Sequence, residues 1–352
     1  MKKRLIAAAA LTLVSTLAAA QSSVTVYGNV DLGVLTQNHA ANKTQLYNGG
    51  ISPSVWGFRG SEDLGGGLKA HFNLEGHIAA DTGAAGGNAT TGAAALFRRQ
   101  SNVGLSSADW GTLTLGNQYS PAILAFAATD PRGLRENFSG LYPWAYNSGV
   151  LTTGGNQNND VGVFIQNAIS YSHTLGPVGI AGGYSVSETK GAVVSLGVTY
   201  AGPVSLSAAY QATNKPNTSE RLSSIYTLGA GYTLGDFTGK LNYLRGSNKD
   251  ATTLADVSKV GVLGAGLDWR TSTANTVGVS AYFAKDKNHS ADKTTTLILS
   301  DEYALSKRTT LYGTLAFANA KAGATLLTSV VAGGTMADAN TTLLNVGIKH
   351  AF

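Results

Sequence analysis

The sequence contains no cysteine, only seven prolines and 13% charged residues in a length of 352. Without cysteine there can be no disulfide bond and no thiolate chemistry. Long apolar runs are also missing after residue 20, because glycine, serine, threonine and asparagine interrupt every window. No segment there reaches the roughly 20 apolar residues that a membrane-spanning helix needs. Helical membrane spans are therefore excluded from this part of the chain.

The first twenty residues have a composition of their own. Three basic residues at 2–4 precede an apolar stretch at 5–17, and alanines occupy 18–20. This order is typical of a secretory signal peptide with a small-residue cleavage site. We expect residues 1–20 to be a signal peptide and residues 21–352 to form the mature protein.

The charge balance gives no support for a nucleic-acid partner. The formal net charge is +5, and it falls to +2 when the three basic residues of the expected signal peptide are removed. No linker or change of composition divides the mature sequence, so we expect one large all-β domain.

Apolar and polar residues alternate with a period of two along much of the chain. The pattern is clearest in LKAHFNLEGHI at 68–78, and it recurs at 24–32 and 344–349. Such alternation predicts β-strands with one apolar and one polar face. The apolar face would point to a core in a soluble sandwich, but to lipid in an outer-membrane barrel.

The lengths of the connections favour the barrel. Short turns alternate with mostly longer loops, and the longest loop covers 120–165. Short turns at one end and longer loops at the other are typical of transmembrane barrels, and an even strand number places both termini on the periplasmic side. About sixteen strands are expected, near 22–36, 52–62, 68–80, 95–107, 112–119, 166–174, 178–187, 191–200, 204–213, 222–233, 237–247, 258–269, 275–286, 293–304, 309–319 and 342–352.

Aromatic residues lie towards several of the expected strand ends. In a transmembrane barrel, aromatic girdles mark the two interfaces of the membrane. The candidates for these girdles are Tyr27, Trp56, Trp110, Tyr119, Tyr232, Tyr303 and Phe352.

Several stretches resemble the general-diffusion porins of Gram-negative bacteria, particularly the beta-proteobacterial type. They are SVTVYGNVD at 23–31, SVWGFRGSEDLG at 54–65 with GLKA at 67–70, RQSNVGL at 99–105, GTLTLG at 111–116, and GIKHAF at 347–352. In the family a terminal phenylalanine, here Phe352, is read by the outer-membrane insertion machinery. The resemblance implies a transmembrane antiparallel β-barrel of sixteen strands, a homotrimer, and a third external loop that folds into the lumen.

That third loop would carry part of a charged constriction. It contains Asp130, Arg132, Arg135 and Glu136, which offer both signs of charge. A long connection without strands is commonly functional. We expect these four side chains to line the narrowest part of the channel.

The barrel wall would supply further charges. If Trp56 faces lipid, Arg59 points into the lumen, and the same parity places Glu75 there. Arg98 and Arg99 cannot both face inward in a regular strand. The alternation of the strand favours Arg98, the family resemblance favours Arg99, and a β-bulge would admit both.

Two arginines that the family often carries are replaced by Val55 and Phe164, so only a mild preference for anions is expected. No metal site, cofactor or catalytic residue is predicted, because no His-Glu-x-x-His or Gly-x-Ser-x-Gly motif occurs.

The sequence thus predicts an outer-membrane porin, a water-filled channel for passive diffusion of small hydrophilic solutes and ions. Expected partners are the other copies of a homotrimer, outer-membrane lipid and lipopolysaccharide, and the insertion machinery. The alternatives are a substrate-specific uptake channel of the same barrel type and, with less support, a barrel enzyme or a secreted β-rich adhesin.

Overall fold

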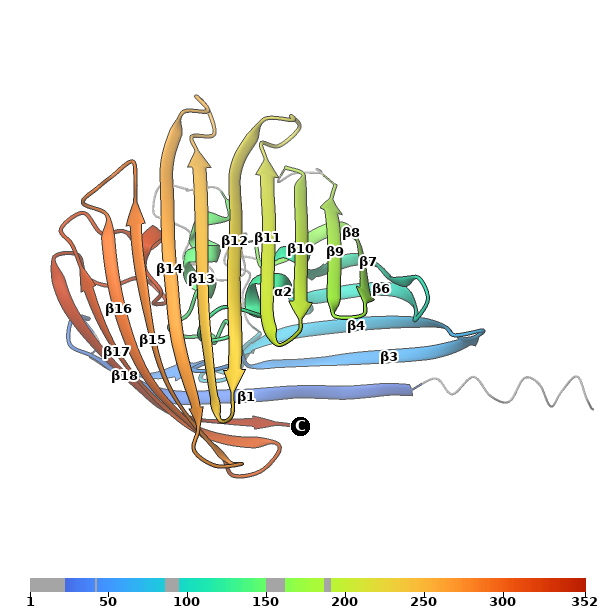
Figure 1. Ribbon diagram of the computed structural model, residues 1–352, viewed down its shortest axis with the longest axis horizontal. Helices are drawn as coiled ribbons and strands as arrows, with labels where there is room; N and C mark the ends of the chain where they lie inside the picture. The colour runs from blue at the N-terminus through green and yellow to red at the C-terminus, as the bar shows by residue number, and fades with distance from the viewer. Residues whose placement is uncertain (1–22, 42, 86–94, 150–161, 187–190) are drawn as a thin grey trace, which may run out of the picture.

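The computed structural model describes residues 23–41, 43–85, 95–149, 162–186 and 191–352, so the expected signal peptide lies outside the described residues. Eighteen strands form one antiparallel sheet (Figure 1). Two of them, β2 (Thr44–Asn48) and β5 (Ala84–Ala85), are short. The other sixteen form the barrel wall: β1 (Ser23–Gln37), β3 (Val55–Gly65), β4 (Leu68–Ala79), β6 (Gln100–Ser107), β7 (Gly111–Tyr119), β8 (Phe164–Leu175), β9 (Val178–Ser185), β10 (Val193–Ala201), β11 (Val204–Asn214), β12 (Arg221–Leu234), β13 (Phe237–Lys249), β14 (Asp256–Arg270), β15 (Asn275–Asp286), β16 (Lys293–Ala304), β17 (Thr309–Ala320) and β18 (Ala339–Ala351).

The first and last strands close the sheet into a barrel. β1 pairs with β3 at one edge and with β18 at the other, where Asn29 lies opposite Ala351. The backbone N–H of Phe352 donates to the carbonyl of Gly28 at 3.0 Å, and the N–H of Gly28 donates back at 3.2 Å. The sheet therefore presents no open edge, which is a requirement for strands in lipid. The predicted sixteen-stranded barrel is confirmed.

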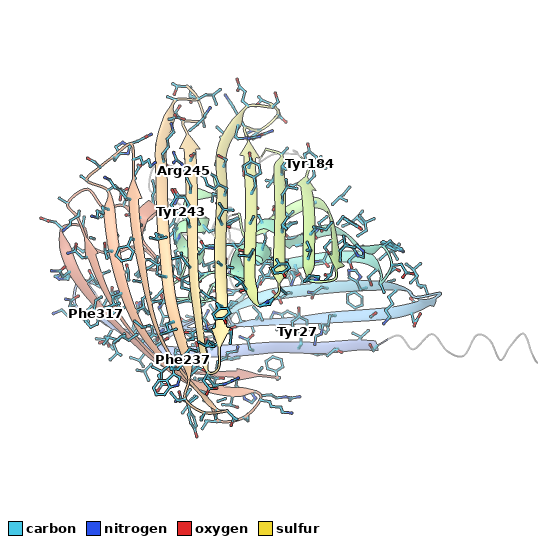
Figure 2. All side chains as sticks on the ribbon, in the orientation of Figure 1. Tyr27, Tyr184, Phe237, Tyr243, Arg245 and Phe317 are labelled. Carbon is cyan, nitrogen blue, oxygen red and sulfur yellow. The ribbon has the colours of Figure 1, made fainter. Side chains whose placement is uncertain are left out.

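Side chains alternate between a lipid-facing outer face and an inner face. On the outer face Leu196, Leu241 and Phe283 are 48%, 53% and 49% exposed. Gly197, which follows Leu196 on β10, and Asn242, which follows Leu241 on β13, lie on the inner face. Figure 2 shows Phe237 and Phe317 on the wall among the outward side chains. The period of two in the sequence thus arises because one face meets lipid and the other meets water or the inserted loop.

Connections differ in length at the two ends of the barrel. Two- to four-residue turns join β8 to β9, β12 to β13 and β14 to β15, and Figure 1 shows the last two at the lower end with the loops above. The described residues contain no helix that is long and apolar enough to cross a membrane. The expected segregation of short turns from longer loops is confirmed.

Outward aromatic side chains gather near the turn end. Phe237 and Trp269 stack with their ring centroids 5.8 Å apart, and Trp110, Tyr232 and Tyr303 are exposed. The prediction was wrong for two residues. The hydroxyl of Tyr27 donates hydrogen bonds to the side chains of Asn73 and Glu75, and the hydroxyl of Tyr119 contacts Arg99. Both rings therefore point into the barrel. Position along a strand located these rings near an end, but it did not specify the face.

The first loop departs most from the expected pattern. Its middle forms β2, which pairs with β1, and residues 49–54 then bulge inward before β3 begins. The buried carboxylate of Asp31 holds this bulge, because it accepts hydrogen bonds from the backbone N–H groups of Gly50, Ile51 and Ser52 at 3.2, 2.9 and 2.8 Å. The hydroxyl of Tyr312 donates to the same carboxylate at 2.6 Å.

Replacing Asp31 with alanine should destabilise the barrel, because three buried donors and one part-buried donor would lose their acceptor. A hydrogen bond to a charged group is worth about 1.5–3 kcal/mol, but water that enters the vacated space can replace part of what the four donors lose, so we expect a net loss of roughly 2–4 kcal/mol of unfolding free energy. Urea unfolding in lipid vesicles, followed by tryptophan fluorescence, measures it. Asp109→Ala, in an exposed turn, is the control; equal midpoints for the two variants would show that Asp31 contributes little.

Candidate functional site

The described parts of the connection between β7 and β8, residues 120–149 and 162–163, fold back inside the barrel. The connection begins with α2 (Pro121–Ala127), which the hydroxyl of Ser120 caps by accepting from the N–H of Ile123. The N–H of Ala122 donates to Ser195 at 2.9 Å, on the inner face of β10. The predicted insertion of the third loop into the lumen is confirmed, and Figure 1 shows α2 behind the wall of β10–β12.

A compact apolar core stabilises the inserted loop. Phe126 of α2 stacks on Trp144 of α3 (Leu141–Asn147) with ring centroids 5.4 Å apart, and both side chains are buried. The last long loop, residues 321–338, also turns inward through η2 (Leu326–Thr328). Its backbone carbonyl at Leu327 accepts from the side chain of Asn147 at 3.0 Å. Sequence reasoning missed this second inserted loop, although its apolar LLTSVV segment is a signal for it.

Asp130 fixes the middle of the inserted loop. Its carboxylate accepts from the N–H groups of Arg132, Leu134 and Gly140 at 3.1, 2.9 and 3.1 Å, and from the hydroxyl of Tyr282 at 3.1 Å. The residue is fully buried, and burial raises the pKa of its carboxyl group against the opposing effect of these hydrogen bonds. The structure therefore places Asp130 inside the loop, away from the lumen water.

Arg132 and Arg135, which follow Asp130 in the loop, lie against the wall formed by β14–β16. Arg135 forms a two-pronged ion pair with Glu302 of β16, with N–O distances of 2.8 and 2.7 Å. Arg132 is almost buried, and burial lowers the pKa of its guanidinium group. Its Nε and one Nη have no hydrogen-bond partner among the described residues. Both arginines border a cavity of about 260 Å³ together with Asp268, Arg270, Ser280 and Glu302.

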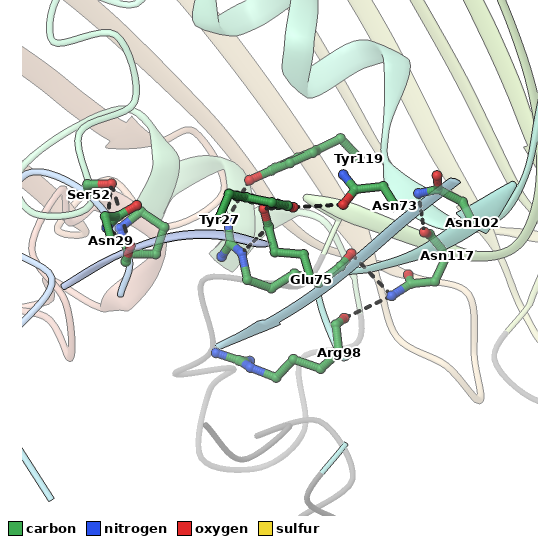
Figure 3. A network of polar contacts seen from close by, with 11 residues as sticks. Tyr27, Asn29, Ser52, Asn73, Glu75, Arg98, Asn102, Asn117 and Tyr119 are labelled. Carbon is green, nitrogen blue, oxygen red and sulfur yellow. Dashed lines mark hydrogen bonds and ion pairs between the residues drawn. The ribbon is translucent and has the colours of Figure 1, made fainter. Parts of the chain in front are cut away.

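A second ion pair lies on the other side of the barrel, between β4 and the turn that precedes β6. Arg99 donates from Nε to Glu75 of β4 at 2.8 Å and also contacts the hydroxyl of Tyr119. Its guanidinium group lies 5.0 Å from the ring centroid of Phe164, the residue that replaces one expected arginine. The Tyr27 hydroxyl donates to the same glutamate at 3.0 Å, as Figure 3 shows. Glu75 and Arg99 are therefore buried against each other.

The structure explains why parity could not choose between Arg98 and Arg99. β6 begins only at Gln100, so both arginines belong to a turn in which strand alternation does not apply. The carbonyl of Arg98 accepts from Asn117 at 2.9 Å (Figure 3). Burial, with a contribution from the charge of Arg99, lowers the pKa of Arg98 to about 10. The strand expected at 95–107 is present, but it begins at Gln100 and not at residue 95.

Two further candidates lie on either side of the loop. Arg59 is exposed on the inner face of β3, with its guanidinium group 5.0 Å from the ring centroid of Tyr27. Glu136 is half-buried and approaches the first loop, since its Cγ would lie 3.0 Å from a Cβ placed on Gly49. The charge of Glu136 raises the pKa of Arg98 in opposition to burial.

The eight charged candidates thus fall into three groups. Arg59 and Glu75 belong to β3 and β4, Arg98 and Arg99 belong to the turn that precedes β6, and Asp130, Arg132, Arg135 and Glu136 belong to the inserted loop. No group of three or more histidine, aspartate and glutamate side chains within the described ranges could hold a metal ion. The arrangement offers fixed charges of both signs on the inner side of the barrel.

A family profile described as Gram-negative porin matches residues 7–323. Outer membrane porin protein 32 of Delftia acidovorans is 35% identical to the chain, over the full length of both. The chain belongs to the Gram-negative porin family. It is therefore a channel-forming protein of the Gram-negative outer membrane and not an enzyme.

Solved porin structures agree with this assignment. An anion-selective porin from Comamonas acidovorans is 30% identical, with a TM-score of 0.78 over 94% of this porin and 100% of that chain. OmpT of Vibrio cholerae in its trimer form is 13% identical, with a TM-score of 0.65 over 94% of this porin and 99% of that chain, so this likeness concerns the fold alone. Porins pass small solutes through the barrel, and the inserted loop lies where it can narrow that passage.

Proposed function

We propose that this porin favours anions mildly, and that the preference arises where the inserted loop lies between the wall of β3 and β4 and the wall of β14–β16. The observation that supports this is the pattern of ion pairs. Arg99 is neutralised by Glu75, and Arg135 by Glu302. Arg59 and Arg132 form no ion pair within the part of the chain that the structure describes. The two charges without an ion-pair partner named here are both positive, so we infer a small positive excess at the constriction.

Such charges can act on every permeating ion. The Debye length at physiological salt is about 8 Å, comparable with the half-width of a narrowed channel. Asp130 is not part of this filter, because its carboxylate is buried in the loop and serves to position Arg132. The selectivity should weaken as salt concentration rises.

The relative from Comamonas acidovorans carries the description anion-selective, which supports the proposed sign. We further propose that the chain assembles as a homotrimer, is exported by a signal peptide at 1–20, and contacts lipopolysaccharide and the insertion machinery through its outer surface and Phe352.

The test is the reversal potential of single channels in a KCl gradient. Arg59→Ser should shift the potential towards cations. Arg99→Ser should shift it further, because Glu75 would lose its only ion-pair partner among the described residues. Glu75→Gln should shift it towards anions, and the double variant Arg99→Ser/Glu75→Gln should return close to the parent.

A parent that prefers K⁺, or an Arg99→Ser channel with the potential of the parent, would overturn the proposed filter. Lys307→Ser is the matched control. Lys307 lies in the short turn between β16 and β17, at the end of the barrel away from the long loops, so this variant should leave the potential unchanged.

A second candidate function is uptake of a particular anionic solute. The cavity of about 260 Å³ that Arg132, Arg135 and Arg270 border supports it, because three arginines surround a space large enough for a small carboxylate. Saturable block of the current by one dicarboxylate, abolished in Arg132→Gln, would favour this function over general diffusion.

A further inference from the structure

Basic residues form one row on the outer face of the barrel, at the ends of β13–β17 nearest the long loops. The register places Arg245 opposite Gly261, Gly261 opposite Lys285, and Lys285 opposite Lys293. The N–H of Lys321 donates to the carbonyl of Lys293 at 3.0 Å, which extends the row to β17. We call Arg245, Lys285, Lys293 and Lys321 the cationic row.

The side chains of the row point away from the lumen. Each has the same parity as outward apolar neighbours on its strand, for example Phe283 before Lys285 and Leu297 after Lys293. Figure 2 shows Arg245 above Tyr243 on β13. The row therefore lies where the outward apolar band ends, at the boundary of the outer leaflet.

Three lysines side by side are unfavourable without a counter-charge. Directly opposite residues on adjacent strands have Cβ atoms about 4.5–5.5 Å apart, and like charges in such pairs destabilise a sheet. None of Lys285, Lys293 and Lys321 forms an ion pair within the described ranges. The row thus concentrates positive charge at one site on the lipid-facing surface.

The carboxylates next to Lys285 and Lys293 in the sequence do not supply that counter-charge. Asp286 follows Lys285 but points inward, where it is fully buried and accepts from the N–H of Lys259 at 2.8 Å. Asp292, which precedes Lys293, is likewise buried and bonds Thr325 and Thr328. Of the outward acids, Asp256 is paired with Lys259, and the exposed Asp338 lies beside Lys321 at the end of the row.

A shallow apolar groove lies below the row on the same face. Small side chains open it at Ala230, Ala265 and Ala281, and Leu241, Leu267 and Val279 border it. Its volume is about 530 Å³. Ala281 precedes Lys285 by four residues, which is roughly 13 Å along a strand. A cationic row above an apolar groove matches an amphiphile with an anionic head and a hydrocarbon chain.

We propose that this surface binds the phosphorylated glucosamine head of lipid A from lipopolysaccharide, with the phosphates on the cationic row and an acyl chain in the groove. Lipid A is the anionic amphiphile of the outer leaflet, and the row lies at the loop end of the barrel. The proposal rests on the outer-membrane location and specifies the lipopolysaccharide contact proposed above, but it is independent of ion selectivity.

The test compares two triple variants that lose the same charge. Lys285→Gln/Lys293→Gln/Lys321→Gln removes three members of the row, whereas Lys43→Gln/Lys215→Gln/Lys307→Gln removes three lysines elsewhere on the loops and turns. Protein refolded in neutral detergent, free of lipid, is titrated with bisphosphorylated lipid A, and bound lipid is counted by native mass spectrometry. We expect at least tenfold weaker binding for the row variant and parent affinity for the control.

Lipid A that lacks phosphates should have the same affinity for the parent as for the row variant. Equal affinity of the parent and the row variant for bisphosphorylated lipid A would overturn the proposal, and so would equal binding of phosphatidylglycerol and lipid A by the parent. A change of oligomeric state in the row variant alone would identify the row as a subunit contact and would also overturn it. Reversal potential, measured on the same variants, should stay at the parent value, so failure here is distinguishable from failure of the anion filter.

Discussion

Deletion of Phe352 should reduce the amount of folded barrel in the outer membrane at least tenfold and leave periplasmic aggregates. Its backbone makes both hydrogen bonds with Gly28 that complete the pairing of β18 with β1. Its ring also lies close against Gly28, within 3 Å of where a Cβ would stand. An unpaired edge in lipid leaves backbone groups without partners, each at a cost of several kcal/mol. Membrane fractionation and heat-modifiable mobility on gels measure the result.

The matched control is Phe352→Tyr, which keeps the ring and the backbone hydrogen bonds and should be recovered at the level of the parent. Normal outer-membrane recovery of the deletion would show that Phe352 is dispensable both for closure and for the insertion machinery.

Excision of residues 131–139 should raise single-channel conductance about twofold or more and admit larger sugars in a liposome-swelling assay. The flanking residues can be joined, because the carboxylate of Asp130 already bonds the N–H of Gly140 at 3.1 Å. The excised segment includes Arg135, which fastens the loop to Glu302. Its removal should take away the part of the loop that crosses towards β16.

The control excision is 251–254, at the tip of the exposed loop between β13 and β14, where the N–H of Asp250 already bonds the carbonyl of Ala255. It should leave conductance and size exclusion as in the parent. If the excision of 131–139 leaves size exclusion unchanged as well, the segment does not restrict the passage.

Much of the fold could be predicted from the sequence because the membrane imposes a simple rule on each strand. Every strand from Val178 onwards follows the alternation closely, and the expected boundaries lie within a few residues of the observed ones. β2 was missed because it is only five residues long and its pairing with β1 depends on the bulge that Asp31 holds. Such a bulge is a tertiary feature with no periodic pattern.

The candidate site was less predictable, since its residues belong mainly to loops. Alternation assigns Arg59 and Glu75 to the inner face, and it can do so because both belong to regular strands. It failed for Arg99, which lies just before β6, and it could not reveal that Asp130 accepts four hydrogen bonds from its own loop and β15. Composition showed that both charge signs occur in the loop, but only the structure shows which charges neutralise each other.

The pairing that closes the barrel also constrains the order in which the protein can fold. Each wall strand pairs with the wall strand that precedes or follows it in the chain, except for the contact between β1 and β18. Local hairpins have low loop-closure entropy and form early, whereas a contact between the two ends of a chain forms slowly. Until Ala351 reaches Asn29, both outermost strands present unpaired edges that can join other chains. We therefore expect the unfolded chain to be open to association with other chains until the final strand has docked.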